Sequence, residues 1–408
     1  HFGAQSGQRP LLDFDQPAGD DGVLNGGETD VDCGGTTCLA CPAGKACLGP
    51  TDCIDQVCTG GACQPANCSD GVMNANETDI DCGGNICPRC SDGKACFGYT
   101  DCTGGSCDPT LLICITPPSC LSGAPGTGEN CGATGNLPCC GSQFGQNVLF
   151  NRDNDPTLPA QISVNYRLDI FEVTVGRFRA FVNAGKGTQA TAPMAAAGTF
   201  PPVPGSGWST SYNPKLPVDT AALMTAVKCD PTFATWTDTA GANEHKPMVC
   251  LDWHLAYAFC IWDVARLPTE AEWSNVAVGG LSQLVYPWGG AVPSKSRAAY
   301  DCLADNSAAG NCAATDIVNV GVLGLGVNGY GHYDISGNAS EWVRDLYAVS
   351  PPLPCKNCVA LSGITPTENV VRGSDWQGTS ASMATAQNRS HLLPATISAK
   401  VGVRCARK

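Results

Sequence analysis

Oxygen-bearing side chains recur at one spacing twice within the first hundred residues. The stretch "DGVLNGGETDVDCGG" at 21–35 is matched by "DGVMNANETDIDCGG" at 70–84. Clustered carboxylates repel one another unless a cation lies between them, and calcium takes six to eight oxygens in flexible geometry. The pattern predicts calcium as a cofactor, and the other interpretation is that these side chains cap turns. The predicted ligands are Asp21, Asn25, Glu28, Asp30 and Asp32 in the first stretch and Asp70, Asn74, Glu77, Asp79 and Asp81 in the second.

The stretch "RGSDWQGTSASMATAQNRS" at 372–390 contains no cysteine, in a chain that has 27. Its side chains are mostly small and polar. Residues 374–390 are therefore a candidate loop for contacting a ligand.

Cysteine usage divides the chain into two regions. Nineteen cysteines lie in residues 1–140 and eight in the remainder. Six of them, from Cys33 to Cys58, recur 49 residues later between Cys82 and Cys107, which indicates tandem modules. Each module has too few apolar residues for a core, so disulfides must hold it together. Because 27 is odd, at least one thiol is free or pairs between chains.

These patterns set the predicted domain organisation. An arm (1–19) precedes two cysteine-rich repeats (20–66 and 67–119) and a cysteine-rich linker (120–145), and residues 146–408 form one larger domain. The repeats resemble the cysteine-rich repeats of secreted bacterial surface proteins, often from myxobacteria. That resemblance implies no particular activity.

Composition excludes several classes of protein. The net charge is −14, whereas nucleic-acid-binding proteins concentrate Lys and Arg on one face. No apolar run approaches the roughly 18 residues that a membrane span needs. The cysteine density, in a chain that does not begin with Met, predicts an exported protein whose signal peptide has been removed. We therefore expect a secreted or cell-surface location.

Helical signals are found in the larger domain. Apolar residues fall on one helical face over 172–184, and Asp252 is a predicted N-cap for a helix over 251–265. Thr269 with Glu272 forms a predicted capping box for a helix over 269–280. The rest of this domain consists of short apolar runs among Gly and Pro, which are typical of short strands. Two or three helices among short strands indicate an α+β fold.

The same region carries an ordered set of motifs between residues 172 and 406. They are "EVTVGRFRAFV", "ARLPTEAEWSNVAVGG", "YPWGG", "NGYGHYDISGNASEWVRD", "VVRGSDW" and "VGVRCA". In this order they resemble the formylglycine-generating-enzyme (sulfatase-modifying factor) family. The resemblance implies a C-type-lectin-like fold with a small twisted sheet, two main helices and long ordered loops. The family includes copper-dependent oxidases that convert a substrate cysteine to formylglycine, and also ligand-binding members without that activity, so fold does not settle function.

The resemblance also assigns individual positions. The two cysteines with which the oxidases bind copper and substrate align with Gly378 and Met383, which implies a lost oxidase site. A family disulfide aligns with Cys260 and Cys405. A family calcium site, built largely from backbone carbonyls, aligns with Ser336, Gly337, Ala339 and Glu341.

These observations predict a secreted, calcium-stabilised protein without enzymatic activity. One role is self-assembly into an extracellular filament or coat, in which the arm, apolar at Phe2, Leu11, Leu12 and Phe14, lies against another subunit. The alternative for the arm is that it docks on its own chain. The other role is binding of a glycan or protein ligand through the loop 374–390, and the remaining enzyme alternative is a divergent copper-dependent oxidase. The predicted ligand-contacting residues are Ser374, Asp375, Gln377 and Asn388.

Overall fold

The structure is a computed structural model that describes residues 19–36, 38–108, 111–145, 148–364, 367–378 and 385–407. The chain divides into two compact units, His1–Arg89 and Cys90–Lys408, and the second has mixed α and β structure. The division falls inside the predicted second repeat because the later half of that repeat contacts the larger domain, where Arg167 Nη2 donates to Phe97 O at 3.1 Å. All of the predicted arm except Gly19 lies outside the described residues. No helix among the described residues is long and apolar enough to cross a membrane.

Disulfides take the place of a hydrophobic core in the first unit. Its one hairpin among the described residues joins β1 (Cys58–Thr59) to β2 (Ala62–Cys63), and the hydrophobic cluster that includes residues of this hairpin consists of cysteines. A module this poor in apolar residues buries too little surface to fold alone, and cross-links reduce the entropy that folding must overcome. The bridges described there are Cys33–Cys41, Cys47–Cys58, Cys53–Cys63 and Cys68–Cys87.

The later half of the second repeat has the same connectivity. Cys96–Cys107 joins residues 11 apart, as Cys47–Cys58 does, and Cys102–Cys114 is the counterpart of Cys53–Cys63. A hairpin of β3 (Ser106–Cys107) and β4 (Cys114–Ile115) follows, like that of β1 and β2. The spacing of 49 residues in the sequence therefore corresponds to one repeated disulfide pattern.

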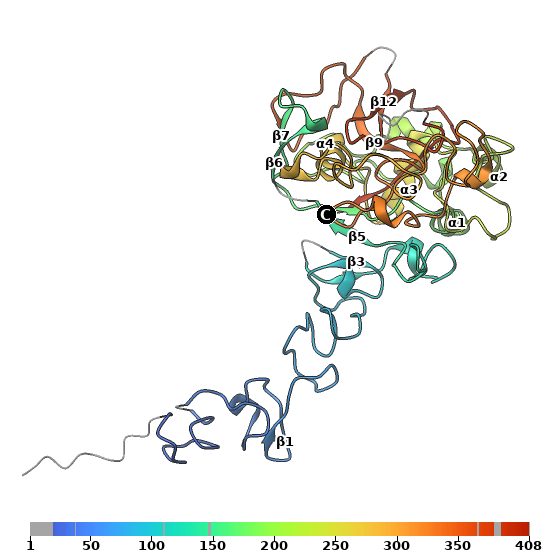
Figure 1. Cartoon of the computed structure of the whole chain (residues 1–408). Helices are drawn as coiled ribbons and strands as arrows, with labels where there is room; N and C mark the ends of the chain where they lie inside the picture. Colours follow the sequence, from blue (N-terminus) through green and yellow to red (C-terminus); the bar gives the residue numbers. More distant parts are fainter. Residues whose placement is uncertain are drawn as a thin grey trace, which may run out of the picture. The chain divides into compact units, whose positions relative to one another are not determined.

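The larger domain contains four α-helices among its described residues (Figure 1). Two begin at the caps that the sequence predicts: Asp252 Oδ1 accepts from Leu255 N at 2.7 Å, and Thr269 forms a capping box with Glu272. The second of these helices ends at Ala277, and Gly279, two residues later, has a φ of 68°, which favours glycine. The helices are α1 (Val175–Asn183), α2 (Thr220–Ala226), α3 (Trp253–Trp262) and α4 (Glu270–Ala277).

Short strands form three sheets of three or four strands among the described residues of this domain. Their orders are β12-β11-β9-β13, β14-β8-β5 and β10-β7-β6. The strands are β5 (Ser142–Phe144), β6 (Leu149–Asn151), β7 (Pro159–Gln161), β8 (Arg167–Asp169), β9 (Ser340–Leu346), β10 (Cys355–Lys356), β11 (Asn369–Arg372), β12 (Arg389–Leu392), β13 (Val401–Gly402) and β14 (Ala406–Arg407).

The central strand β9 is buried on both faces. Trp342 packs in a cluster with residues of α1 and α3, whereas the neighbouring Val343 packs in a cluster with residues of α4. Successive side chains of a strand point to opposite faces, so the sheet separates two hydrophobic cores. Val371 and Val370 of β11 divide between the same two clusters. The loop that follows β11 therefore begins from a strand that is fixed on both sides.

Candidate functional site

Residues 373–378, the described start of the segment that follows β11, are held mainly by backbone contacts and by the buried Trp376. Gly373 turns the chain with a φ of 78°, a conformation that favours glycine. Trp376 is buried at 1% exposure, and Gly378 O accepts from Asp301 N at 2.8 Å. Gly378, which the family resemblance aligns with one oxidase cysteine, has no side chain, and Met383, which it aligns with the other, lies outside the described residues.

The four residues predicted to contact a ligand differ in accessibility. Ser374 is buried, and its hydroxyl lies 3.4 Å from that of Ser336. Asp375 accepts from Gln377 N at 2.8 Å, and burial raises the pKa of this aspartate. Asn388 Nδ2 donates at 2.7 Å to the carbonyl of the glycine that follows β11. The loop therefore places Ser374 in the interior and leaves Asp375, Gln377 and Asn388 partly exposed.

The carboxylate of Glu341, on β9, already has partners inside the protein. Arg404 Nε lies 2.8 and 2.9 Å from its two oxygens, and Trp273 Nε1 donates to it at 2.8 Å. The preceding loop is held by the backbone, since Gly337 N donates to Ser374 O at 3.2 Å. A calcium ion at this predicted site would have to compete with the guanidinium of Arg404.

Two more carboxyl groups lie close to Glu341. Ala339 N donates to Glu172 Oε1 at 2.9 Å, and burial together with repulsion from Asp334 and Glu341 raises the pKa of Glu172 well above its usual range. Burial also raises the pKa of Asp334 to about 6. Three buried carboxyl groups therefore share one arginine, and an unpaired buried charge is costly.

The cysteines of the larger domain are all joined in disulfides. Residues 137–408 contain ten cysteines, and all ten lie in the described part of the chain. Cys260 and Cys405 are bonded with their Cα atoms 5.5 Å apart, which ties α3 to the end of the chain. A disulfide sulfur carries no thiolate, the form that binds copper(I). The bridges are Cys120–Cys140, Cys131–Cys139, Cys229–Cys250, Cys260–Cys405, Cys302–Cys312 and Cys355–Cys358.

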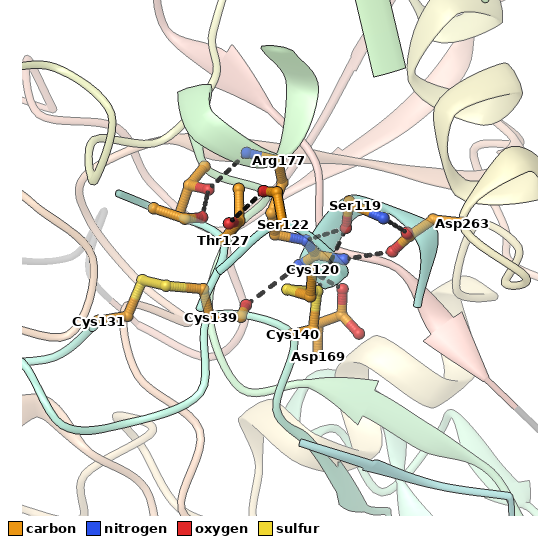
Figure 2. Close-up of a disulfide and its surroundings, with 12 residues drawn as sticks. Ser119, Cys120, Ser122, Thr127, Cys131, Cys139, Cys140, Asp169, Arg177 and Asp263 are labelled. Carbon is orange, nitrogen blue, oxygen red and sulfur yellow. Dashed lines mark hydrogen bonds and ion pairs between the residues drawn. A yellow bond between two sulfur atoms is a disulfide. The ribbon is translucent and has the colours of Figure 1, made fainter. Parts of the chain in front are cut away.

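Buried charges fix the predicted linker to the larger domain (Figure 2). Arg177 of α1 is completely buried and pairs with Asp169 at 2.9 Å and with Asp263 at 2.7 Å. Its Nε donates to Ser119 Oγ at 3.0 Å, and its Nη1 donates to Cys139 O at 3.4 Å. Figure 2 shows these partners around one guanidinium. The segment predicted to be a linker is therefore anchored to the domain near both of its ends.

The carboxylates of the two repeats accept backbone amides in matching ways. Asp32 Oδ1 accepts from Gly22 N at 2.7 Å, and Asp81 Oδ1 accepts from Gly71 N at 2.9 Å. Such bonds brace turns. The same is true of two further pairs: Glu28 and Glu77 accept from Asn25 N and Asn74 N, and Asp30 and Asp79 accept from Val31 N and Ile80 N.

The two asparagines of the pattern, Asn25 and Asn74, each have a side-chain oxygen that accepts no hydrogen bond. Asn25 Nδ2 donates to Asp21 at 2.9 Å and Asn74 Nδ2 to Asp70 at 3.1 Å, while both Oδ1 atoms are buried without a hydrogen-bond partner. A bound cation would satisfy such an oxygen. Among the described residues, however, no group of three or more His, Cys, Asp or Glu ligands within 4.8 Å contains more than one carboxylate. Calcium binding would therefore require the loops to close further.

The thiol of Cys38 lies next to this region. Its Sγ is 3.1 Å from Glu28 Oε1, and it is a cysteine that the structure leaves outside any disulfide. The odd cysteine count predicts such a residue but not its position.

Sequence analysis missed several residues of this domain. Arg177 lies in an amphipathic pattern, where an arginine is expected on the exposed face. Arg404 directly precedes Cys405 in the motif "VGVRCA", and that motif was the signal that could have identified it. Helix α2 was also missed, although Asp219 caps it, because Leu223 is its only buried residue.

Comparison with known proteins agrees with this architecture. Residues 137–408 match the family described as sulfatase-modifying factor enzyme 1-like domain. The fold and this match define a protein built around a formylglycine-generating-enzyme-type domain, and the chain belongs to that family.

Its relatives include active and inactive members. An inactive C-alpha-formylglycine-generating enzyme 2 from Mus musculus is 29% identical over 265 residues, which is 59% of this chain and 74% of the relative. A formylglycine-generating enzyme from Thermomonospora curvata is 31% identical over 159 residues, which is 35% of this chain. The chain spans 51% of the length of that enzyme.

Solved structures with similar folds were also found. PvdO from Pseudomonas aeruginosa superposes with a TM-score of 0.39 at 17% identity, and the match covers 65% of this chain and 90% of the PvdO chain. Treponema denticola variable protein 1 superposes with a TM-score of 0.38 at 18% identity, and the match covers 65% of this chain and 94% of the Treponema chain.

Proposed function

We propose that this protein is a non-catalytic member of its family, in which the larger domain is a structural or ligand-binding body. The observation that carries the proposal is that all ten cysteines of residues 137–408 are joined in disulfides. Copper(I) needs soft thiolate ligands, and the aligned positions hold Gly378 and Met383. A relative named as inactive also supports a role without oxidase activity.

We further propose that the protein is exported. Disulfides form and persist in oxidising compartments and are rare in the cytosol. The first repeat depends on them for its interior, since its cluster of buried hydrophobic residues consists of cysteines. In a reducing compartment these modules would lose their disulfides, which replace a hydrophobic core.

Calcium is the cofactor that we propose for the repeats. What supports it is the repetition of the same side chains in both modules and the buried, unpartnered Oδ1 of Asn25 and of Asn74. We do not extend the proposal to Glu341, because Arg404 compensates that carboxylate. Calcium would draw the loop oxygens together and add binding free energy to the native state.

A ligand-binding role through the loop 374–390 is the second candidate. It rests on a C-type-lectin-like arrangement of the larger domain, which we propose from the family motifs, and on the anchoring of this loop by buried Trp376. Asp375 and Gln377 are then the accessible polar contacts for a glycan or a protein surface. Self-assembly through the arm is a further proposal, and removal of residues 1–18 should abolish any assembly that light scattering detects in the intact chain.

Oxidase activity is the decisive test of the proposed function. The full chain is supplied with copper(I), a thiol reductant, oxygen and a cysteine-bearing sulfatase peptide, and mass spectrometry follows conversion of cysteine to formylglycine. We expect no conversion. The matched variant Gly378→Cys with Met383→Cys restores both aligned thiols and is the control for copper supply. Conversion by the unaltered chain that disappears in Met383→Ala would refute the proposal.

A further inference from the structure

We propose that the Cys355–Cys358 disulfide is a thiol–disulfide exchange site that is reduced by low-molecular-weight thiols such as glutathione. This goes beyond the proposed function, because it involves neither copper nor the loop after β11. Three features of this bridge carry the proposal: the short loop that it closes, the charge beside it and the contacts that hold its loop.

The bridge closes a Cys-x-x-Cys motif on itself. The sequence contains two other motifs of this spacing, but Cys41 is bonded to Cys33 and Cys87 to Cys68. The separation of Cys355 and Cys358 is 3 residues, whereas the other bridges described here span 8 to 145. A disulfide stabilises a fold mainly by restricting the unfolded chain, and the effect shrinks with loop length. Among the disulfides described, this bridge is therefore expected to contribute least to the stability of the fold.

A buried arginine lies beside one of the two sulfurs. Arg152 Nη1 is 3.9 Å from Cys358 Sγ, and Arg152 is 2% exposed. A neighbouring positive charge lowers the pKa of a thiol and stabilises the thiolate that reduction releases. Cys358 is partly exposed and Cys355 is buried at 4% exposure. Cys358 Sγ is thus accessible to a thiolate, and it is also the sulfur that lies beside the guanidinium of Arg152.

The loop is held by contacts that do not depend on the disulfide. Cys355 and Lys356 of β10 pair in parallel with Ala160 and Gln161 of β7. Asn357 fixes the turn, since its Oδ1 accepts from Ser163 N at 2.7 Å and its Nδ2 donates to Ser163 Oγ at 2.7 Å. The bridge can therefore open and close again while its two cysteines stay in place.

The exchange proceeds in two steps and transfers two electrons. A glutathione thiolate attacks Cys358 Sγ, forms a mixed disulfide there and displaces Cys355, which leaves as a thiolate and takes up a proton. A second glutathione thiolate attacks the glutathione sulfur of the mixed disulfide. Oxidised glutathione leaves, and Cys358 is released as a thiolate beside Arg152. Two thiols are oxidised to one disulfide as the protein bridge is reduced to two thiols.

Graded mixtures of reduced and oxidised glutathione test the site on the full chain. Existing thiols are first blocked, newly formed thiols are alkylated with a second reagent, and peptide mass spectrometry quantifies each bridge. We expect Cys355 and Cys358 to be reduced at about tenfold less glutathione than the control bridges Cys229–Cys250 and Cys302–Cys312, because less native structure opposes their opening. Co-reduction of all three bridges, or their reduction only on unfolding, would overturn the proposal.

Two variants test the assigned roles of the residues. Cys355→Ser should accumulate glutathione on Cys358 when oxidised glutathione is added, because the Cys358 thiolate attacks that disulfide, releases one reduced glutathione, and has no neighbouring cysteine to displace the glutathione that remains. Arg152→Gln should slow the second step, in which Cys358 leaves as a thiolate, about tenfold by raising the pKa of that thiol, and Arg152→Lys should keep most of the rate. If Arg152→Gln unfolds the domain, the Arg152→Lys rate and the bridge comparison in the unaltered chain decide the case. An Arg152→Gln variant that is folded and reduced at the original rate would contradict the role of this arginine.

Discussion

Removing the Cys260–Cys405 disulfide should cost far more stability than removing Cys355–Cys358. The first bridge closes a separation of 145 residues and the second a separation of 3. The chain-entropy relation assigns about 5 kcal/mol to the longer loop and about 2 kcal/mol to the shorter one at 25 °C. Alanine suits the longer bridge, because both of its cysteines are buried at 0% exposure and alanine leaves no polar group there.

Denaturant unfolding of the two double variants measures this difference. All eight tryptophans lie between residues 208 and 376, so their fluorescence reports on the larger domain without interference from the first repeat. We expect Cys260→Ala with Cys405→Ala to lower the free energy of unfolding by roughly 3 kcal/mol more than Cys355→Ala with Cys358→Ala. Equal losses in the two variants, or a loss below about 1 kcal/mol for the longer bridge, would show that loop closure does not stabilise this domain as reasoned.

Three further predictions concern charge. Arg177→Met should lower the free energy of unfolding by about 3–5 kcal/mol, because it leaves Asp169 and Asp263 buried with one fewer cation, and an unchanged denaturation midpoint would contradict this. Burial raises the pKa of Asp345 from 3.8 to about 7, so between these values the native state holds a proton that the unfolded chain has lost. Stability should therefore fall as pH rises through this window, and Asp345→Asn should flatten the slope in pH-dependent melts. Chelation of calcium should lower the melting temperature of the repeats, since calcium at a hundredfold its Kd adds about 2.7 kcal/mol, and an indifferent melt would assign these residues to turn capping alone.

The features that could be predicted from the sequence are those that local pattern encodes. Asp252 and the Thr269–Glu272 pair act within one helical turn, so their spacing alone locates the starts of α3 and α4. The repeated cysteines likewise fix the module length without any knowledge of which sulfurs pair. The alignment of Gly378 and Met383 with the oxidase cysteines, which rests on the order of the motifs, stays a prediction.

The features that could not be predicted depend on residues that meet only in the folded chain. Arg177 and Asp263 are 86 positions apart, and no periodicity relates them. Arg404, the partner of Glu341, is 63 positions away in the sequence. No local pattern shows that an arginine compensates this carboxylate, so the motif alone suggested a calcium ion in that role. Disulfide connectivity has the same character, since evenly repeated cysteines permit many pairings.

Copper(I) binding by the full chain tests the central claim most directly. The measurement is a competition between the protein and a coloured copper(I) chelator, made with Cys38→Ser so that the thiol outside the larger domain contributes nothing. The proposed function predicts that the chelator keeps all of the copper, because the cysteines of residues 137–408 are joined in disulfides. One equivalent of copper(I) held by the folded protein and released by Met383→Ala would contradict it.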